Sequence, residues 1–163
     1  MLNPQQLFDR LAELGIAHAT VEHAPVFTVE EAKAHRGELR GHHIKNLFLR
    51  NKKEEMWLVV ALEDRVVDLK RPGEALGAGR LSFGSPQRLA RYLGVEPGSV
   101  TPFALINDTA HQVTLVLDRG LADDRPVNAH PLTNTMTTAI SFADLGRFFA
   151  ATGHAPQWLD FPL

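Results

Sequence analysis

Apolar residues recur at helical spacing in three segments of the chain, and a capping residue precedes each segment: Asn3, Ser85 and Ser141. Proline follows the first two caps, at a position that suits the first residue of a helix. The apolar positions are Leu7, Leu11 and Leu14 in the first segment, Leu89, Tyr92 and Leu93 in the second, and Phe142, Leu145, Phe148 and Phe149 in the third. We therefore expect three amphipathic helices, of which the first ends near Gly15 and the second near Gly94.

Two shorter helices are also predicted. Thr28 and Glu31 stand at the spacing of a capping box, which predicts a helix that runs to about Arg36. Asp68 is a candidate cap for another short helix, after which three glycines between residues 73 and 79 mark a bend.

Other apolar segments are short and rich in residues that favour strands. Residues 44–50 and 56–62 are two such runs, and the polar residues 51–55 join them as a hairpin. Further strands are predicted at 19–22, 113–117, 128–130 and 135–140. This order mixes helices with hairpin-linked strands and contains no linker long enough to divide it. We therefore predict a single α+β (mixed α/β) domain over residues 1–163.

Composition narrows the possible functions. The 163 residues carry a formal net charge of −2 and include no cysteine, so a disulfide, a thiolate nucleophile and a cysteine-bound zinc are excluded. No apolar run approaches the ~20 residues of a membrane span. The net charge argues against broad binding of DNA or RNA, although it leaves open a local contact with an RNA end. The first residues lack the features of a secretory signal, so we expect a cytoplasmic protein without a membrane partner.

Lys45 is the most informative single residue. In a strand, Lys45, Leu47 and Leu49 would face one side while Asn46 and Phe48 face the other, which places the ammonium on an otherwise apolar face. Burying a cation there is costly unless it is paired or opens into a pocket that holds an anion, so Lys45 is a candidate ligand-binding residue. The alternative is that Lys45 lies at the first turn of the strand and reaches water. Other cations flank this strand in sequence, as is usual for a solvated surface: Arg36, Arg40, Arg50, Lys52, Lys53, Lys70, Arg71 and Arg80.

Two loops could contribute to a binding site. The loop from Gly98 to Pro102 has glycine and proline at a spacing that would hold N–H groups outward, as in a nest for an anion or an oxyanion. Glycine and proline also occur in loops for purely conformational reasons. Residues 128–135 bring His130 together with amides and hydroxyls, which fits equally well a hydrogen-bonded turn without chemistry.

Metal and nucleotide cofactors have no support in the sequence. His42 and His43 are adjacent and would face opposite sides of a strand, and no His-x-x-x-His pair has an acidic partner on a helix. Glycine-rich nucleotide motifs are also missing from the sequence. We therefore predict neither a metal nor another cofactor.

The sequence contains residues that could form a Ser-His-Asp catalytic triad, but no local motif supports one. Neither candidate serine has the sequence context of an activated nucleophile, and a chain of this length offers such trios by chance. The members would be Ser85 or Ser99, His130, and Asp108 or Asp118.

Four segments, taken in order, carry a family pattern. They are Pro25-Val26-Phe27-Thr28-Val29-Glu30-Glu31, Lys45-Asn46-Leu47-Phe48-Leu49, the Gly98 to Pro102 loop, and Asn128 to Thr135. Together they resemble the YbaK/prolyl-tRNA-synthetase-associated editing family over nearly the whole chain, and the chain looks most like the free-standing Ala-tRNA(Pro) deacylases of that family. The resemblance implies a central mixed β-sheet flanked by helices. It also implies metal-independent hydrolysis of Ala-tRNA(Pro), assisted by the free ribose hydroxyl of the substrate.

The resemblance further implies roles for individual residues. Lys45 would bind the phosphate and ribose end of the acceptor strand, and Gly98 would lie in the loop that faces the aminoacyl ester. The substrate-binding positions would be Val29, Ala32, Asn46, Ser99, Val100, Thr101, Pro102 and His130, of which Val29, Ala32 and His130 would bound the acyl pocket. The implied partner is the acceptor end of aminoacyl-tRNA(Pro), with prolyl-tRNA synthetase or elongation factor as further candidates. Two alternatives stay open, a deacylase of Cys- or Ser-charged tRNA and a non-catalytic module that binds a tRNA end.

Overall fold

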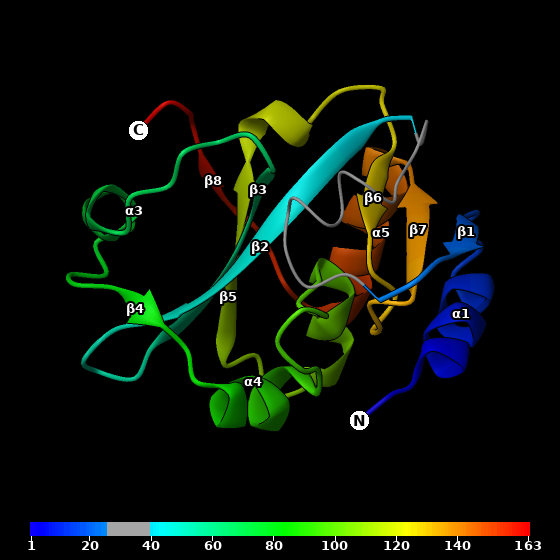
Figure 1. Ribbon diagram of the computed structural model, residues 1–163, viewed down its shortest axis with the longest axis horizontal. Coiled ribbons are helices and arrows are strands. Elements are labelled where there is room, and N and C mark those ends of the chain that lie inside the picture. The colour runs from blue at the N-terminus through cyan, green and yellow to red at the C-terminus, as the bar shows by residue number, and fades with distance from the viewer. Residues whose placement is uncertain (26–39) are drawn as a thin grey trace.

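A mixed β-sheet runs through the molecule in the computed structural model, which describes residues 1–25 and 40–163 (Figure 1). Its strands are β1 (Ala19–Glu22), β2 (His42–Arg50), β3 (Met56–Leu62), β4 (Ser82–Phe83), β5 (Val113–Asp118), β6 (Val127–Ala129), β7 (Met136–Ile140) and β8 (Gln157–Leu159). The order is β1-β7-β6-β2-β3-β5-β8, and β4 pairs with β2 beside this path. The β6–β2, β3–β5 and β5–β8 pairs are parallel and the others are antiparallel. The predicted α/β fold with a central mixed sheet is confirmed.

The three amphipathic helices predicted from capping residues are confirmed. They are α1 (Pro4–Glu13), α4 (Pro86–Leu93) and α5 (Phe142–Thr152), and two 3₁₀ helices, η1 (Pro102–Asn107) and η2 (Arg119–Leu121), lie on either side of β5. The side chains of Asn3, Ser85 and Ser141 each accept a hydrogen bond from the main-chain N–H three residues later. The helix predicted to start at Thr28 lies outside the described residues. None of the described helices is both long enough and apolar enough to span a membrane.

The short helix α3 (Lys70–Ala75) differs in detail from its prediction. Leu69 occupies its N-cap position, although the Asp68 carboxylate accepts a hydrogen bond from the Lys70 N–H at 3.0 Å. Gly73 belongs to this helix and not to a bend, and a Cβ there would lie 2.2 Å from the Gly79 carbonyl oxygen. The glycine therefore permits close packing of the helix against the following loop.

Two hydrophobic clusters lie on opposite sides of the sheet, because successive strand residues face opposite ways. The larger cluster includes Leu58 and Val60 of β3 and is covered by α1, α4, η1 and α5. The smaller cluster includes Trp57 and Val59 of the same strand, with α3 and residues near the C-terminus packed against it. Phe48 belongs to the larger cluster and Leu49 to the smaller one, so the predicted alternation along β2 is confirmed.

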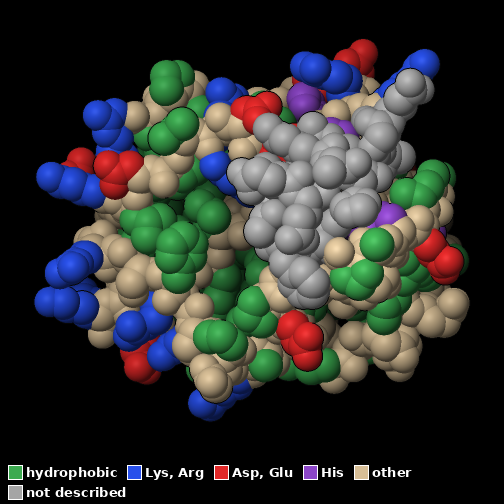
Figure 2. Space-filling model, in the orientation of Figure 1, with side chains coloured by type: hydrophobic (Ala, Val, Ile, Leu, Met, Phe, Trp, Pro, Cys, Tyr) green, Lys and Arg blue, Asp and Glu red, His purple; other side chains and the backbone are tan. Residues whose placement is uncertain are grey.

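β2 has an opening along one of its edges. β3 pairs with residues 44–50 on one edge, so β6 and β4 share the other, where β6 pairs with residues 42–43 and β4 with residues 49–50. Residues 44–48 have no partner strand on that edge among the described strands. Figure 2 shows that the surface seen in this view is hollowed beside the grey residues, and that hydrophobic side chains gather beside the hollow, over β3 and β4 of Figure 1.

Candidate active site

Lys45 is half-buried on β2, on the side of the sheet that carries the smaller cluster. Its ammonium donates a hydrogen bond to the main-chain carbonyl of Arg65, in the loop that follows β3. The partner is thus a neutral dipole, neither an anion nor only water. No described carboxylate forms an ion pair with Lys45, so its positive charge remains available to an anionic ligand.

The loop that holds Lys45 is anchored by Asp118 at the end of β5. The Arg65 guanidinium donates to this fully buried carboxylate, with Nε–Oδ2 at 2.9 Å and Nη2–Oδ1 at 3.3 Å. The main-chain N–H groups of Leu62 and Gly120 donate to it at 3.0 and 2.8 Å. Burial opposes ionisation of Asp118, but these hydrogen bonds and the Arg65 charge outweigh burial and lower its pKa below the usual value. Asp118 therefore stays ionised and fixes the carbonyl that meets Lys45.

Asn46 lies at the centre of the opening in β2 and points to the opposite side from Lys45. Its side-chain oxygen Oδ1 is buried and has no hydrogen-bond partner among the described residues. A buried acceptor without a donor costs about 1–3 kcal/mol, so such atoms often mark a place where a ligand supplies the missing donor. The unpaired oxygen therefore makes Asn46 a candidate ligand-binding residue, independently of the family resemblance.

His130 follows β6 directly and is half-buried. β6 and β2 pair in parallel, and this pairing ends with His43 opposite Asn128, two residues before Lys45 in β2 and two residues before His130. Its Nδ1–H donates to the Met136 carbonyl at 3.0 Å, so Nε2 is the acceptor nitrogen, and none of the described residues donates a hydrogen bond to it. Burial lowers the pKa of His130, the nearby His23 ring adds to this effect, and the hydrogen bond to Met136 only partly opposes it. The imidazole is therefore neutral near pH 7.

The loop from Gly98 to Pro102 is held firmly against the larger cluster. Gly98 has a φ of 89°, which favours glycine, and Val100 packs against the cluster. Ser99 donates its N–H to the Glu96 carbonyl at 3.0 Å, and the Thr101 hydroxyl accepts from the Phe103 N–H at 3.3 Å. The expectation that the N–H groups of this loop point outward is therefore wrong for Ser99, whose N–H is used within the turn.

The predicted site residues are only partly brought together. Lys45 lies in β2 and His130 directly follows β6, the strand that pairs with the start of β2, while Asn46 is next to Lys45 at the open edge. The Gly98 to Pro102 loop packs on the other side of the sheet from the Lys45 side chain, and no hydrogen bond joins the loop to Lys45. Val29 and Ala32 lie outside the described residues.

The candidate site residues lie within a region of the chain that matches a known protein family. Residues 23–148 match the model of the aminoacyl-tRNA editing domain, and this match includes Lys45, Asn46, the Gly98 loop and His130. The chain belongs to the aminoacyl-tRNA editing domain family.

Relatives of this editing domain are similar over almost their whole length. The prolyl-tRNA editing protein ProX of Acetoanaerobium sticklandii is 38% identical over 151 residues, which cover 92% of each chain. The prolyl-tRNA synthetase associated domain-containing protein 1 of Danio rerio is 41% identical over 159 residues, which cover 96% of this chain and 86% of the relative. A solved protein described as a candidate trans-editing enzyme for prolyl-tRNA synthetase has the same fold, with a TM-score of 0.69, 22% identity and 98% of each chain covered.

Other polar residues of the editing domain have structural partners. Asp108 accepts from the His154 ring at 2.8 Å, Asp118 binds Arg65, and neither contacts His130, whose partner is Met136. The Ser-His-Asp triad is therefore not formed. Among residues 1–25 and 40–163, no three His, Asp or Glu side chains gather in a group that could hold a metal ion.

Sequence reasoning missed the pairing of Arg65 with Asp118, which it had considered only as a possible member of a catalytic triad. They are separated by 53 positions and meet only because β3 and β5 pair in parallel, a contact that leaves no local signal in the sequence.

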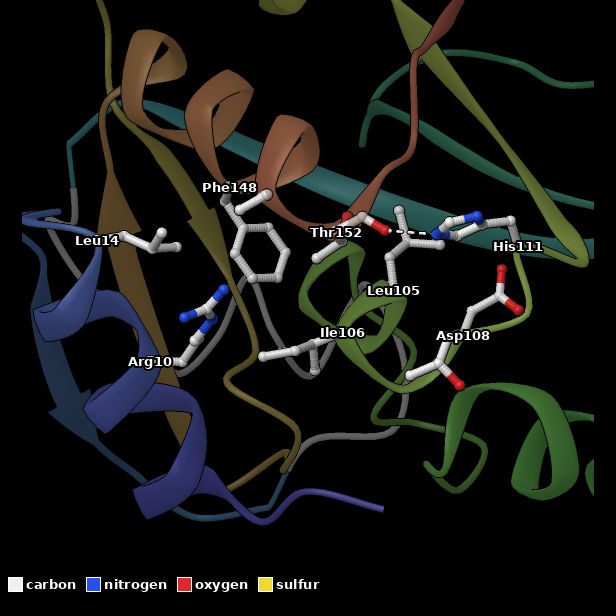
Figure 3. Close-up of a pocket in the computed structure, with 10 residues that line it drawn as sticks. Arg10, Leu14, Leu105, Ile106, Asp108, His111, Phe148 and Thr152 are labelled. Atoms are coloured by element: carbon white, nitrogen blue, oxygen red, sulfur yellow. Dashed lines mark hydrogen bonds between the residues drawn. The ribbon is translucent and has the colours of Figure 1, made fainter.

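A separate cavity of about 270 Å³ lies between α1, η1 and the end of α5 (Figure 3). Leu14, Ile106 and Phe148 form apolar walls, and the His111 ring donates to the Thr152 carbonyl at 2.9 Å at one side. Lys45, Asn46, the Gly98 to Pro102 loop and His130 do not line this cavity, so it is distinct from the described part of the candidate active site.

Proposed function

We propose that this editing domain hydrolyses the ester that joins a wrong amino acid to tRNA(Pro), with alanine as the preferred amino acid. The observation that carries the proposal is the similarity to the prolyl-tRNA editing protein ProX over 92% of both chains. In the reaction, water adds to the ester carbonyl carbon and the bond to the ribose oxygen breaks. The products are free alanine and tRNA(Pro) with its ribose hydroxyl restored.

In this proposal, Lys45 holds a phosphate near the 3′ end of the tRNA. Among the described residues, the partner of the half-buried Lys45 is a neutral carbonyl and no carboxylate, so its positive charge suits an incoming phosphate. The buried Oδ1 of Asn46 would accept a hydrogen bond from the substrate. A free ribose hydroxyl of the terminal nucleotide assists the hydrolysis, as the family resemblance implies, and the protein supplies position and polarisation.

We assign the selection of the amino acid to size exclusion. His130, with Val29 and Ala32, would bound an acyl pocket that admits alanine and rejects proline, which carries two further carbons in a ring. The loop from Gly98 to Pro102 would face the ester with its backbone. Since the Ser99 N–H is already bonded to Glu96, that donor is not assigned to the oxyanion.

Two other functions are compatible with the same fold. A deacylase of Cys- or Ser-tRNA would need a pocket that differs by one sulfur or oxygen atom, a change worth only about 1–3 kcal/mol in specificity. A non-catalytic module would bind the tRNA end without turnover. The Lys45 ammonium, whose partner among the described residues is a neutral carbonyl, and the Asn46 acceptor support a site that binds a ligand, and both the deacylase and the non-catalytic module would use such a site.

A panel of tRNA(Pro) charged with Ala, Cys, Ser or Pro tests the proposal when deacylation is measured with and without a chelator. We expect the fastest hydrolysis for Ala, none for Pro, and no effect of the chelator. Binding without hydrolysis of any substrate would favour the non-catalytic module, and loss of activity with the chelator would contradict a metal-free reaction. We further propose that the domain acts in the cytoplasm on tRNA released from prolyl-tRNA synthetase or carried by elongation factor, which co-purification with each protein tests.

A further inference from the structure

The residues that follow β8 pack against the loop that supports Lys45. Phe161 and Leu163 contact the smaller cluster, and the Arg71 guanidinium of α3 donates to the main-chain carbonyl of Leu163. A cleft of about 390 Å³ is lined both by these residues and by Arg65 and its neighbours in the loop. Figure 1 shows the red C-terminal end beside the segment that joins β3 to α3. The two segments therefore lie side by side, although they are distant in the sequence.

Phe161 contacts the side chain of Arg65 in this loop. The guanidinium carbon Cζ of Arg65 lies over the Phe161 ring, 5.3 Å from the ring centroid. The face of an aromatic ring attracts a cation, and the attraction grows where water is partly excluded. Water is partly excluded here, because the Arg65 side chain is 30% exposed and its other partner, Asp118, is fully buried. The guanidinium is therefore held by two partners of different kinds, a carboxylate and a ring.

The backbone of Arg65 joins this contact to the candidate active site. Its carbonyl accepts a hydrogen bond from the Lys45 ammonium, and its N–H donates to the Leu62 carbonyl at 3.0 Å. Asp118 holds the guanidinium through Nε and Nη2, and the ring adds a contact that the carboxylate does not supply. Side chains that are locked by packing as well as by hydrogen bonds hold a site most firmly, so Phe161 can influence Lys45 through Arg65.

Apolar burial alone does not require a ring at position 161. Leu163 packs against the same cluster, so a leucine at position 161 would also suit this surface. What the ring adds over an aliphatic side chain is the contact with Arg65. Phe161 also lies beyond residues 23–148, the region that matches the family model, so the family resemblance assigns it no role.

We propose that Phe161 is a positioning residue for Lys45. Its ring restrains the Arg65 guanidinium, and the Arg65 carbonyl in turn fixes the Lys45 ammonium at the place where the substrate phosphate binds. This inference rests on the proposed function, because it takes Lys45 as a ligand for a phosphate of aminoacyl-tRNA(Pro). Phe161 itself is assigned no contact with the substrate.

Phe161→Leu tests the inference, because it keeps an apolar side chain against the smaller cluster and removes the ring. We expect it to raise KM for Ala-tRNA(Pro) by roughly 2- to 10-fold, as for loss of a partly exposed cation–π contact, with kcat changed less than about twofold. Phe161→Tyr keeps the ring and should match wild type. Tyr92→Leu is the matched control, since it removes a ring that lies 5.3 Å from the Arg91 guanidinium on the other side of the sheet, and it should leave KM unchanged.

A double-mutant cycle separates positioning from general damage. If Phe161 acts through Lys45, Phe161→Leu should have no further effect on KM in a Lys45→Ala protein. The same fold-change in both backgrounds would overturn the inference. An unchanged KM in the single variant, or an equal loss in Phe161→Tyr, would also overturn it.

Amide hydrogen exchange tests the restraint without any substrate. In Phe161→Leu, the Arg65 N–H should exchange roughly 2- to 10-fold faster than in wild type, while the amides of β3 keep their rates. An unchanged rate at Arg65, or the same rise throughout β3, would contradict the role of the ring. A wild-type protein that does not hydrolyse Ala-tRNA(Pro) would exclude the proposed function, whereas faster exchange at Arg65 would still show that Phe161 restrains the partner of Lys45.

Discussion

The ammonium of Lys45 donates a hydrogen bond to the main-chain carbonyl of Arg65. Arg65 cannot move freely, because its side chain is bound to the buried Asp118. The position of Lys45 therefore depends on a carboxylate with which it forms no ion pair, and no described carboxylate neutralises its charge.

Lys45→Ala should lower the rate of Ala-tRNA(Pro) deacylation by at least roughly 10- to 100-fold, because it removes a charge-assisted contact to the substrate phosphate. The fold should persist, since an apolar residue suits this face of β2. Lys52→Ala is the matched control, because Lys52 is exposed in the β2–β3 hairpin. A near wild-type rate for Lys45→Ala would remove the lysine from the mechanism.

Asp118→Asn should lower the free energy of unfolding by about 3 kcal/mol, since it leaves the Arg65 guanidinium without its buried counter-charge. It should also raise KM for the tRNA by loosening the loop that positions Lys45. Asp160→Asn is the control, because the Arg119–Asp160 pair is exposed and such pairs contribute at most ~1 kcal/mol. Equal effects of the two changes in chemical denaturation would refute the anchoring role of Asp118.

Gly98→Val should impair activity through the backbone, because valine resists the φ of 89° and would distort the loop against the larger cluster. We expect a loss of deacylation close to that of Lys45→Ala, together with a lower Tm. Gly77→Val is a useful comparison, because Gly77 also has a positive φ of 64° but has open space around its Cα. If Gly98→Val lowers Tm no more than Gly77→Val does and activity is unchanged, the loop is only a connection.

His130→Ala should change the selectivity more than the overall rate, because removing the ring widens the acyl pocket. The relevant measurement is the relative rate of hydrolysis of Ala-, Ser-, 2-aminobutyryl- and Pro-tRNA(Pro). Larger acyl groups should gain relative to Ala. A uniform fall of roughly 10²–10⁴-fold on all substrates would instead make His130 a general base, acting through its acceptor nitrogen Nε2.

His130 should also contribute to the pH dependence of stability. Its pKa in the folded protein lies below the ordinary value of 6.5, so the unfolded chain takes up a proton that the folded state resists. This group therefore lowers the free energy of unfolding as pH falls below about 6.5, and the loss levels off below the pKa of the folded state. In denaturation experiments between pH 5 and pH 8, His130→Gln should lack this part of the slope. An identical pH profile for both proteins would contradict it.

Local signals in the sequence predicted the elements well. The caps Asn3, Ser85 and Ser141 act within one helical turn, and alternation along β2 depends only on neighbouring residues, so both follow from short-range chemistry. The same reasoning placed Lys45 on an apolar face with an unmet need for a partner.

Long-range contacts could not be predicted in this way. The parallel pairing of β3 with β5 joins distant segments, and it creates the Asp118–Arg65 anchor. The two-residue strand β4 is too short to show alternation, so its pairing with β2 could not be predicted either. Asn46 was a weak candidate from sequence, since its unsatisfied oxygen is visible only once its surroundings are known.

The first helix, α1, packs in the hydrophobic core although it lies outside the region that the family model matches. The family match begins at residue 23, yet Leu7 and Leu11 of α1 are fully buried in the larger cluster, and β1 completes the edge of the sheet by pairing with β7. The match also ends at residue 148, within α5 and before β8. The region that the family model matches is therefore smaller than the packed hydrophobic core, although the relatives are similar over 92–96% of this chain. A gene fragment trimmed to residues 23–148 would expose the apolar face that α1 covers, and we expect it to aggregate where the full chain folds.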